Sequence, residues 1–190
     1  MVVACLGFVM WCGETRAVDR APLPAATQQV LDGIPAMRAQ GDVEGRRYAD
    51  ALNRQGDAAY RKGRFDVAAS KYMHSYPNYP NARAYLLAGD AHWRAVVRYQ
   101  LRHSSTDACG WNNRDFARHM EMDLDQHALV GQILAEREND ARVMRTGLHA
   151  RSVRATACLR GMAREYQALP PQTCVDVRRV RSCLGPPLIR

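Results

Sequence analysis

Lysine is almost absent from this chain of 190 residues: Lys62 and Lys71 are its only lysines, and the other 25 of its 27 basic residues are arginines. Together with the many alanines, this bias is typical of a GC-rich genome and favours a bacterial source, as a compositional association. Proline and glycine are not enriched, and no segment has low complexity. The composition therefore excludes a fibrous or wholly disordered class and indicates one globular domain with a buried core.

The motifs of common catalytic sites are missing as well. The chain contains no Gly-x-Ser-x-Gly elbow, phosphate-binding loop, dinucleotide fingerprint or His-Glu-x-x-His pair. The segment His119–Glu121 has the His-x-Glu form of zinc deaminases, but no Pro-Cys-x-x-Cys follows it. We therefore predict no metal site, no cofactor and no enzyme; a nucleophile pair of Cys109 and His119 is the enzymatic alternative.

No apolar run is long enough to cross a bilayer as a helix, which takes roughly 20 residues. The apolar run Val2–Cys12 instead has the length of a secretory signal core, and Thr15 and Ala17 supply the small side chains that a cleavage site requires. No basic residue precedes the run, so either the true start lies upstream or the run is an ordinary buried helix. We predict that residues 1–25 form a signal or membrane-anchor segment with a linker.

Cysteine usage agrees with export. Without the first segment four cysteines remain, and three of them lie in the last 33 residues. These disulfide candidates are Cys109, Cys158, Cys174 and Cys183. We predict that Cys158 pairs with Cys174 or Cys183 and ties the carboxy-terminal tail to a helix. The alternative is that some are free, buried thiols of a cytoplasmic protein; no pair has the short spacing of structural zinc sites.

The net charge of +8 comes from one part of the sequence. Residues 1–140 hold equal numbers of acidic and basic side chains, whereas residues 141–190 hold 10 basic and 2 acidic ones. The second stretch can attract acidic protein, nucleic acid or an anionic membrane, or it can be a solvated helix face with a basic tail. No helix-turn-helix pattern or exposed aromatic series accompanies its arginines, so nucleic-acid binding is the weaker prediction.

Small and aromatic residues recur at fixed spacing in the first half of the chain. Gly56 and Ala68 are small enough to let two antiparallel helices approach closely, and Gly63 supplies the backbone freedom for the turn between them. Tyr72 is expected to fill the space between one hairpin and the next, and Pro80 to stop the second helix. This spacing predicts a helical hairpin.

The stretch Ala49–Ala95, which contains these residues, resembles the tetratricopeptide repeat (TPR) family, whose pattern spans about 34 residues. The segment Gln55–Ala58 returns 33 residues later as Ala88–Ala91. The second copy then departs from the pattern, because Val96 stands where the turn glycine belongs. The resemblance covers one full and one partial repeat, about a quarter of the chain. An unrelated α-hairpin with small residues at its crossing is the alternative.

The remaining pattern predicts an all-α fold: a TPR-like hairpin array with additional long carboxy-terminal helices, in one domain over residues 26–190. Asn113 is the expected cap of a helix after a loop, and Asn139 or Asp140 the cap of the last one. The expected helices are 26–41 (interrupted near Gly33 and Pro35), 44–61, 64–76, 81–103, one from 113 with an apolar stripe to Ile133, and 140–169; 104–113 is the expected loop.

The resemblance implies a function in protein binding, since TPR units usually bind peptides on the concave surface of their first helices. Carried over by position, the partner-binding residues are Asp50, Asn53, Asp57, Tyr60, Arg61, Arg83, Asp90, Trp93 and Arg94. For Trp93, packing in the core is an equally good interpretation.

The leading hypothesis is a scaffold or accessory protein of the bacterial envelope, periplasmic or membrane-anchored, serving secretion or surface assembly. A cytoplasmic TPR-type secretion chaperone is the alternative. An arginine-rich nucleic-acid-binding protein and a Cys/His enzyme are weaker ones.

Overall fold

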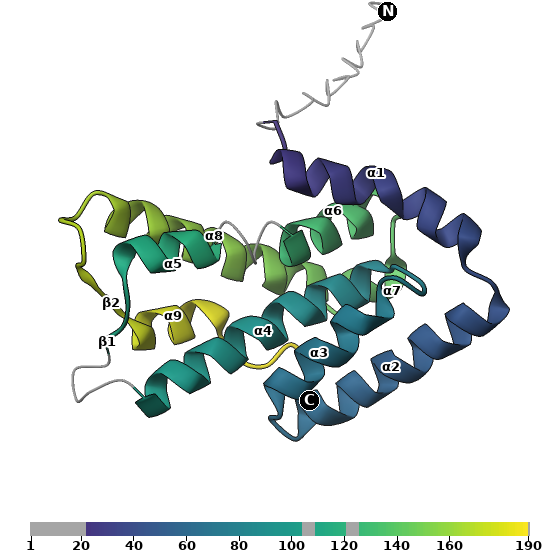
Figure 1. The fold of residues 1–190 in the computed structure, drawn as a ribbon, viewed down its shortest axis with the longest axis horizontal. Coiled ribbons are helices and arrows are strands. Elements are labelled where there is room, and N and C mark those ends of the chain that lie inside the picture. Colours follow the sequence, from purple (N-terminus) through teal and green to yellow (C-terminus); the bar gives the residue numbers. More distant parts are fainter. Residues whose placement is uncertain (1–21, 104–108, 121–125, 190) are drawn as a thin grey trace, which may run out of the picture.

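The computed structural model describes residues 22–103, 109–120 and 126–189. Almost all of the predicted signal or anchor segment lies outside these residues. The described helices are α1 (Ala25–Gln40), α2 (Val43–Arg61), α3 (Phe65–Ser75), α4 (Ala82–His103), α5 (Asn113–His119), α6 (Leu129–Arg137), α7 (Ala141–Arg145), α8 (Leu148–Gln167) and α9 (Val177–Leu184); the strands are β1 (Cys109–Asn112) and β2 (Cys174–Asp176). The prediction of an all-α fold is confirmed (Figure 1).

Helices α2 and α3 form the predicted hairpin. The Asp42 side chain caps α2 by accepting a hydrogen bond from the amide of Gly45. Gly63, at a φ of +69°, makes the turn into α3. The helices cross where Gly56 meets Tyr72: a Cβ on Gly56 would lie 2.7 Å from the Tyr72 ring. The small residue is therefore what permits this close approach.

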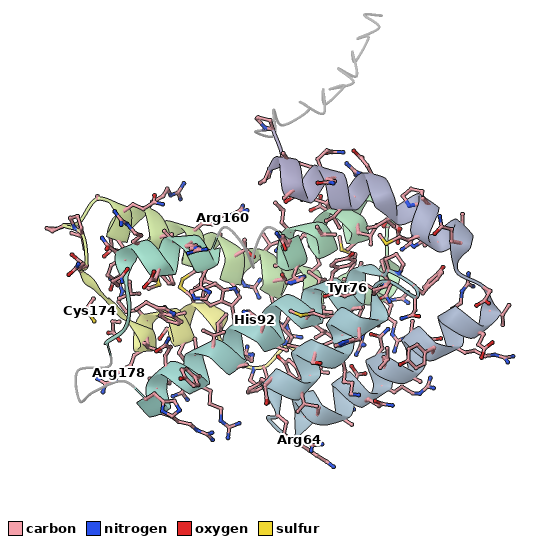
Figure 2. The ribbon with its side chains drawn as sticks, in the orientation of Figure 1. Arg64, Tyr76, His92, Arg160, Cys174 and Arg178 are labelled. Atoms are coloured by element: carbon pink, nitrogen blue, oxygen red, sulfur yellow. A yellow bond between two sulfur atoms is a disulfide. The ribbon has the colours of Figure 1, made fainter. Side chains whose placement is uncertain are left out.

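Helix α4 lies at the centre of the molecule, between α3 on one side and α6 on the other (Figure 1). Tyr76 stacks on Tyr85 of α4, with 3.9 Å between ring centroids, and it lies in the interior (Figure 2). On the other side, a Cβ on Gly131 of α6 would lie 2.9 Å from the backbone nitrogen of Leu86. The helix that crosses α4 here comes from more than 25 residues beyond the end of α4.

Helix α4 separates two hydrophobic cores. The first lies among α1, α2, α3, α4 and α6 and includes Tyr72 and Leu86. The second lies among α4, α5, α8 and α9 and includes Trp93, Phe116 and Leu159. Because α4 contributes side chains to both, its long apolar surface organises the whole domain.

The predicted loop and tail contain structure that the sequence analysis missed. Strands β1 and β2 pair antiparallel, with Asn112 opposite Cys174, and β2 leads directly into α9. The expectation of plain loop and tail was therefore wrong. Val175 and Val177 are fully buried, and this burial fixes the short strand and helix against α8.

Three predicted helix boundaries also needed correction. Asn112, not Asn113, caps α5 by accepting from the amide of Asp115. Pro35 lies inside an uninterrupted α1. The last predicted helix is two helices, because Gly147 adopts a φ of +68° between α7 and α8.

Candidate protein-binding face of α2 and α4

Seven of the nine predicted partner-binding residues fall into two groups on α2 and α4, and we call the surface that carries both groups the α2–α4 face. The first group surrounds a cavity of about 480 Å³, here named the polar hollow, between α2, the start of α4, and α7. The residues that line it are Arg46, Asp50, Asn53, Arg54, Asp57, Tyr79, Asn81, Arg83, Asp140, Arg142 and Val143. Four of the nine predicted residues therefore share one cavity, and its lining contains both acidic and basic side chains.

An ion pair connects α2 and α4 in the polar hollow. Arg83 Nη2 lies 2.9 Å from both carboxylate oxygens of Asp57, and the Tyr72 hydroxyl donates to the same carboxylate at 2.7 Å. Burial and the bond to Asp57 raise the pKa of Tyr72 above its ordinary value of 10.0, so the hydroxyl remains a donor. These contacts orient Asp57 and Arg83 with part of each side chain still exposed.

Asn53 supplies an acceptor that has no donor. Its Oδ1 atom is buried and accepts no hydrogen bond from the described residues. A buried amide oxygen left unpaired costs about 1–3 kcal/mol. The atom is closed to solvent in the wall of the polar hollow, so a donor from a bound polypeptide would remove that cost only after a neighbouring side chain moves aside.

The second group of predicted residues contacts the chain's own carboxy-terminal segment, residues 184–189. Arg94 pairs with the buried carboxylate of Asp90 at 2.7 Å, and the Tyr60 hydroxyl donates to the same carboxylate. Burial raises the pKa of Tyr60 above 10.0, with a further contribution from Asp90. The three side chains form one hydrogen-bonded cluster beneath the segment.

Main-chain atoms of this segment make most of its polar contacts. The Arg94 guanidinium donates to the carbonyls of Leu184 and Gly185 at 3.1 Å and of Pro186 at 2.8 Å. From α8, Arg151 donates to the carbonyls of Pro187 and Leu188. Arg94 of the α2–α4 face and Arg151 of α8 thus bind the polar atoms of this segment through its backbone, while the side chains of Leu184 and Leu188 are buried in the two hydrophobic cores.

Trp93 and Arg61 belong to neither group. Trp93 is 1% exposed and packs edge-on against Phe116, with ring centroids 6.1 Å apart. It therefore lines the second core and not an open surface. Arg61 is exposed at the end of α2.

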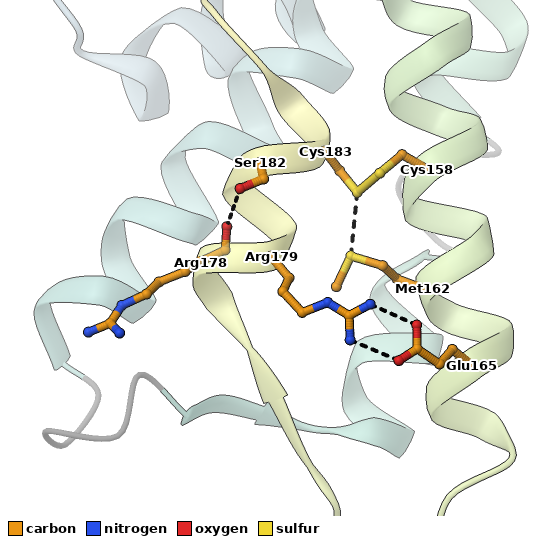
Figure 3. Close-up of a disulfide and its surroundings, with 7 residues drawn as sticks. All are labelled: Cys158, Met162, Glu165, Arg178, Arg179, Ser182 and Cys183. Carbon is orange, nitrogen blue, oxygen red and sulfur yellow. Dashed lines mark hydrogen bonds and ion pairs between the residues drawn. A yellow bond between two sulfur atoms is a disulfide. The ribbon is translucent and has the colours of Figure 1, made fainter.

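A disulfide joins Cys158 of α8 to Cys183 of α9, with 5.4 Å between their Cα atoms (Figure 3). This is one of the two pairings predicted for Cys158. Cys174 is also disulfide-bonded, and the side chain of Cys109 lies outside the described residues. The disulfide holds α9, and with it the start of the carboxy-terminal segment, against α8.

The contacts of Arg151 and of the carboxy-terminal segment were missed by the sequence analysis. Arg151 was one of several arginines on a basic helix, and nothing in its spacing distinguishes it from the others. The polar contacts of the segment are made mostly by its backbone, which carries no sequence signal, and its buried Leu188 has no helical or alternating pattern around it. These contacts could be found only from the fold.

Within the described ranges, no group of three or more His, Cys, Asp and Glu side chains is placed to hold a metal ion. His119 lies beside the Trp111 ring, with 6.3 Å between centroids. None of the described helices has the length and apolar character needed to traverse a bilayer.

Comparison with protein-family models, with curated proteins and with solved structures finds no match to this chain.

Proposed function

We propose that this chain is a protein-interaction scaffold or accessory protein of the bacterial envelope, which binds a partner polypeptide on a TPR-like α2–α4 face. The observation that carries the proposal is the backbone recognition of residues 184–189 by Tyr60, Arg94 and Arg151. A face that holds one non-helical segment through its main chain has the chemistry to hold another beside it. The polar hollow is the adjoining part that the segment leaves open.

The TPR-like character rests on the hairpin of α2 and α3. The close crossing at Gly56 and the turn at Gly63 support this part of the proposal. The envelope location is supported by the disulfide between Cys158 and Cys183, because disulfides persist in oxidising compartments. A role in secretion or surface assembly is the context we propose for such a scaffold.

Site-specific photo-crosslinking in the producing bacterium tests the proposed face. A photoreactive residue in place of Asp50, which is exposed at the polar hollow, should yield a discrete adduct with a partner protein. The same residue in place of Arg154, exposed on α8, should not.

The variant Asn53→Leu separates binding from stability. Replacing the unpaired amide with an apolar side chain should leave the free energy of unfolding unchanged or raised, whereas the adduct at position 50 should be lost. Gln55→Leu, an exposed change on the same helix, is the matched control and should keep the adduct. An adduct that persists in Asn53→Leu would show that the partner binds at the hollow without the Asn53 amide.

A cytoplasmic secretion chaperone with the same face is the alternative location and role. Counting reactive thiols in native protein, extracted without reductant, separates the two. Blocked thiols at Cys109, Cys158, Cys174 and Cys183 are expected for the envelope protein. Free thiols at all four would instead support the chaperone.

A further inference from the structure

A second cavity, of about 850 Å³, lies between α4, α9 and the carboxy-terminal segment, and we call it the arginine pocket. Five arginines line it: Arg94, Arg98, Arg102, Arg178 and Arg181. Among the described residues that line it, none is acidic. Its walls between the arginines are largely apolar and include Phe65, Leu101 and Pro186.

The two helices bring these arginines together by their geometry. On α4 the three arginines are spaced four residues apart, so they share one face of the helix. On α9 the opposite face is fixed to α8, where Arg179 pairs with Glu165 at 2.7 Å and Cys183 is bonded to Cys158 (Figure 3). This anchoring directs Arg178 away from α8 and toward α4, as Figure 3 shows.

Three of the five arginines have no partner among the described residues. Arg94 is paired with Asp90, and Arg98 donates to the carbonyl of Gly63 at 2.6 Å. By contrast, the side chains of Arg102, Arg178 and Arg181 are exposed, and no hydrogen bond or ion pair engages them in the described part of the chain. Positive charges that converge without a counter-charge favour the binding of an anion.

We propose that the arginine pocket binds an acidic segment of a partner polypeptide. Side-chain carboxylates of the segment pair with Arg102, Arg178 and Arg181, because guanidinium groups match carboxylates in two-point hydrogen bonds. An apolar side chain of the segment, between its acidic residues, enters the arginine pocket and packs against Leu101 and Pro186. The inference rests on the proposed function only in taking polypeptide as the ligand, since the arginine pocket is separate from the polar hollow.

The shape of the pocket favours polypeptide over the other polyanions. A single-stranded nucleic acid needs open ring faces on which bases stack. Phe65, the aromatic residue among the described lining, already contacts Tyr60 edge-on at 5.1 Å and lies 5.9 Å from the Arg94 guanidinium. A lipid surface is flat and would contact an exposed patch better than apolar walls recessed between two helices.

Fluorescence anisotropy with a short labelled peptide of alternating aspartate and leucine tests this proposal on the full chain. The variant Arg102→Gln/Arg178→Gln/Arg181→Gln should weaken binding about tenfold or more. The control variant Arg145→Gln/Arg154→Gln/Arg164→Gln removes the same charge from exposed positions outside the pocket, and should change the affinity less than about threefold. Equal losses in the two variants would reduce the effect to general charge attraction and overturn the proposal.

Other probes define the remaining outcomes. A peptide of alternating asparagine and leucine should not bind, since it carries no carboxylates. Tighter pocket-dependent binding of oligothymidylate or of phosphatidylglycerol vesicles than of the acidic peptide would overturn the choice of ligand. If the triple variant does not fold, the single exposed change Arg181→Glu repeats the binding measurement, and it should also weaken binding of the acidic peptide. If the peptide fails to bind while the Asn53-dependent adduct forms, the pocket proposal fails and the proposed function remains.

Discussion

The backbone amide of Leu188 donates a hydrogen bond to the hydroxyl oxygen of Tyr60, with 2.8 Å between the two atoms and 128 residues between them in sequence. The same hydroxyl donates to Asp90 and accepts from Nε of Arg94 at 3.1 Å. One oxygen atom thus connects α2, α4 and the carboxy-terminal segment, and this connection determines which part of the α2–α4 face is covered.

Removing that hydroxyl should destabilise the protein. In Tyr60→Phe the buried Leu188 amide loses its acceptor and the Asp90 carboxylate loses a donor, so the free energy of unfolding should fall by about 2 kcal/mol. Urea denaturation monitored by circular dichroism measures the change. Tyr48→Phe, where the side chain is 57% exposed, is the control and should be neutral. Equal stability of the two variants would show that the hydroxyl contributes nothing there.

The crossing of α2 and α3 gives a second prediction. Gly56→Ala places a Cβ 2.7 Å from the Tyr72 ring, so the helices must separate and the free energy of unfolding should fall by about 1–3 kcal/mol. Gly161→Ala in α8 is the matched control, because its Cβ meets nothing within 4 Å. The control should be stabilised by up to about 1 kcal/mol through higher helix propensity. Similar thermal midpoints for the two variants would contradict the close crossing.

Buried tyrosines predict a loss of stability in alkaline solution. Burial raises the pKa of Tyr85 from 10.0 to about 12, and burial also raises the pKa values of Tyr60, Tyr72 and Tyr76. Because the folded-state pKa exceeds the unfolded one, this stability is complete below pH 10.0 and is lost as the pH rises toward 12. Tyrosinate absorbance should therefore appear together with loss of helical circular dichroism.

The variant Tyr85→Phe checks the cause of this alkaline loss. It removes one of the four groups, so the free energy of unfolding should fall less steeply with pH than in the parent chain. A pH dependence as steep as that of the parent chain would exclude Tyr85 as a contributor.

The fold was predictable where its determinants are close in sequence. Gly56, Gly63 and Ala68 lie within one hairpin, so their spacing predicted its close crossing and its turn, whereas Tyr72, expected outside the hairpin, packs on Gly56 within it. The crossing of α6 over α4 at Gly131 and Leu86 was missed because it depends on a long-range packing that no local periodicity reports. Strands of three or four residues, such as β1 and β2, are too short to show an alternating pattern.

The candidate site was predictable in part. Positions carried over from the repeat pattern placed Asp57 and Arg83 on adjoining helices, and the two residues meet in the polar hollow. The covering of Tyr60 by Leu188 was beyond prediction, because the contact is made by a backbone amide. Trp93 had two equally good interpretations, since a large aromatic residue suits a core as well as a surface; it lies in the core.

The disulfide between Cys158 and Cys183 gives the last prediction. It closes a loop with a sequence separation of 25, and a cross-link of that span lowers the entropy of the unfolded chain enough to stabilise the fold by about 3 kcal/mol. The double variant Cys158→Ser/Cys183→Ser should lose about that much free energy of unfolding. Its α9 and Leu188 amides should exchange hydrogen faster through local opening, whereas those of α3, which packs against α2 and α4, should exchange faster only by the amount that the global loss of stability accounts for. Unchanged exchange at Leu188 would mean that Tyr60, Arg94 and Arg151 hold the segment without the cross-link.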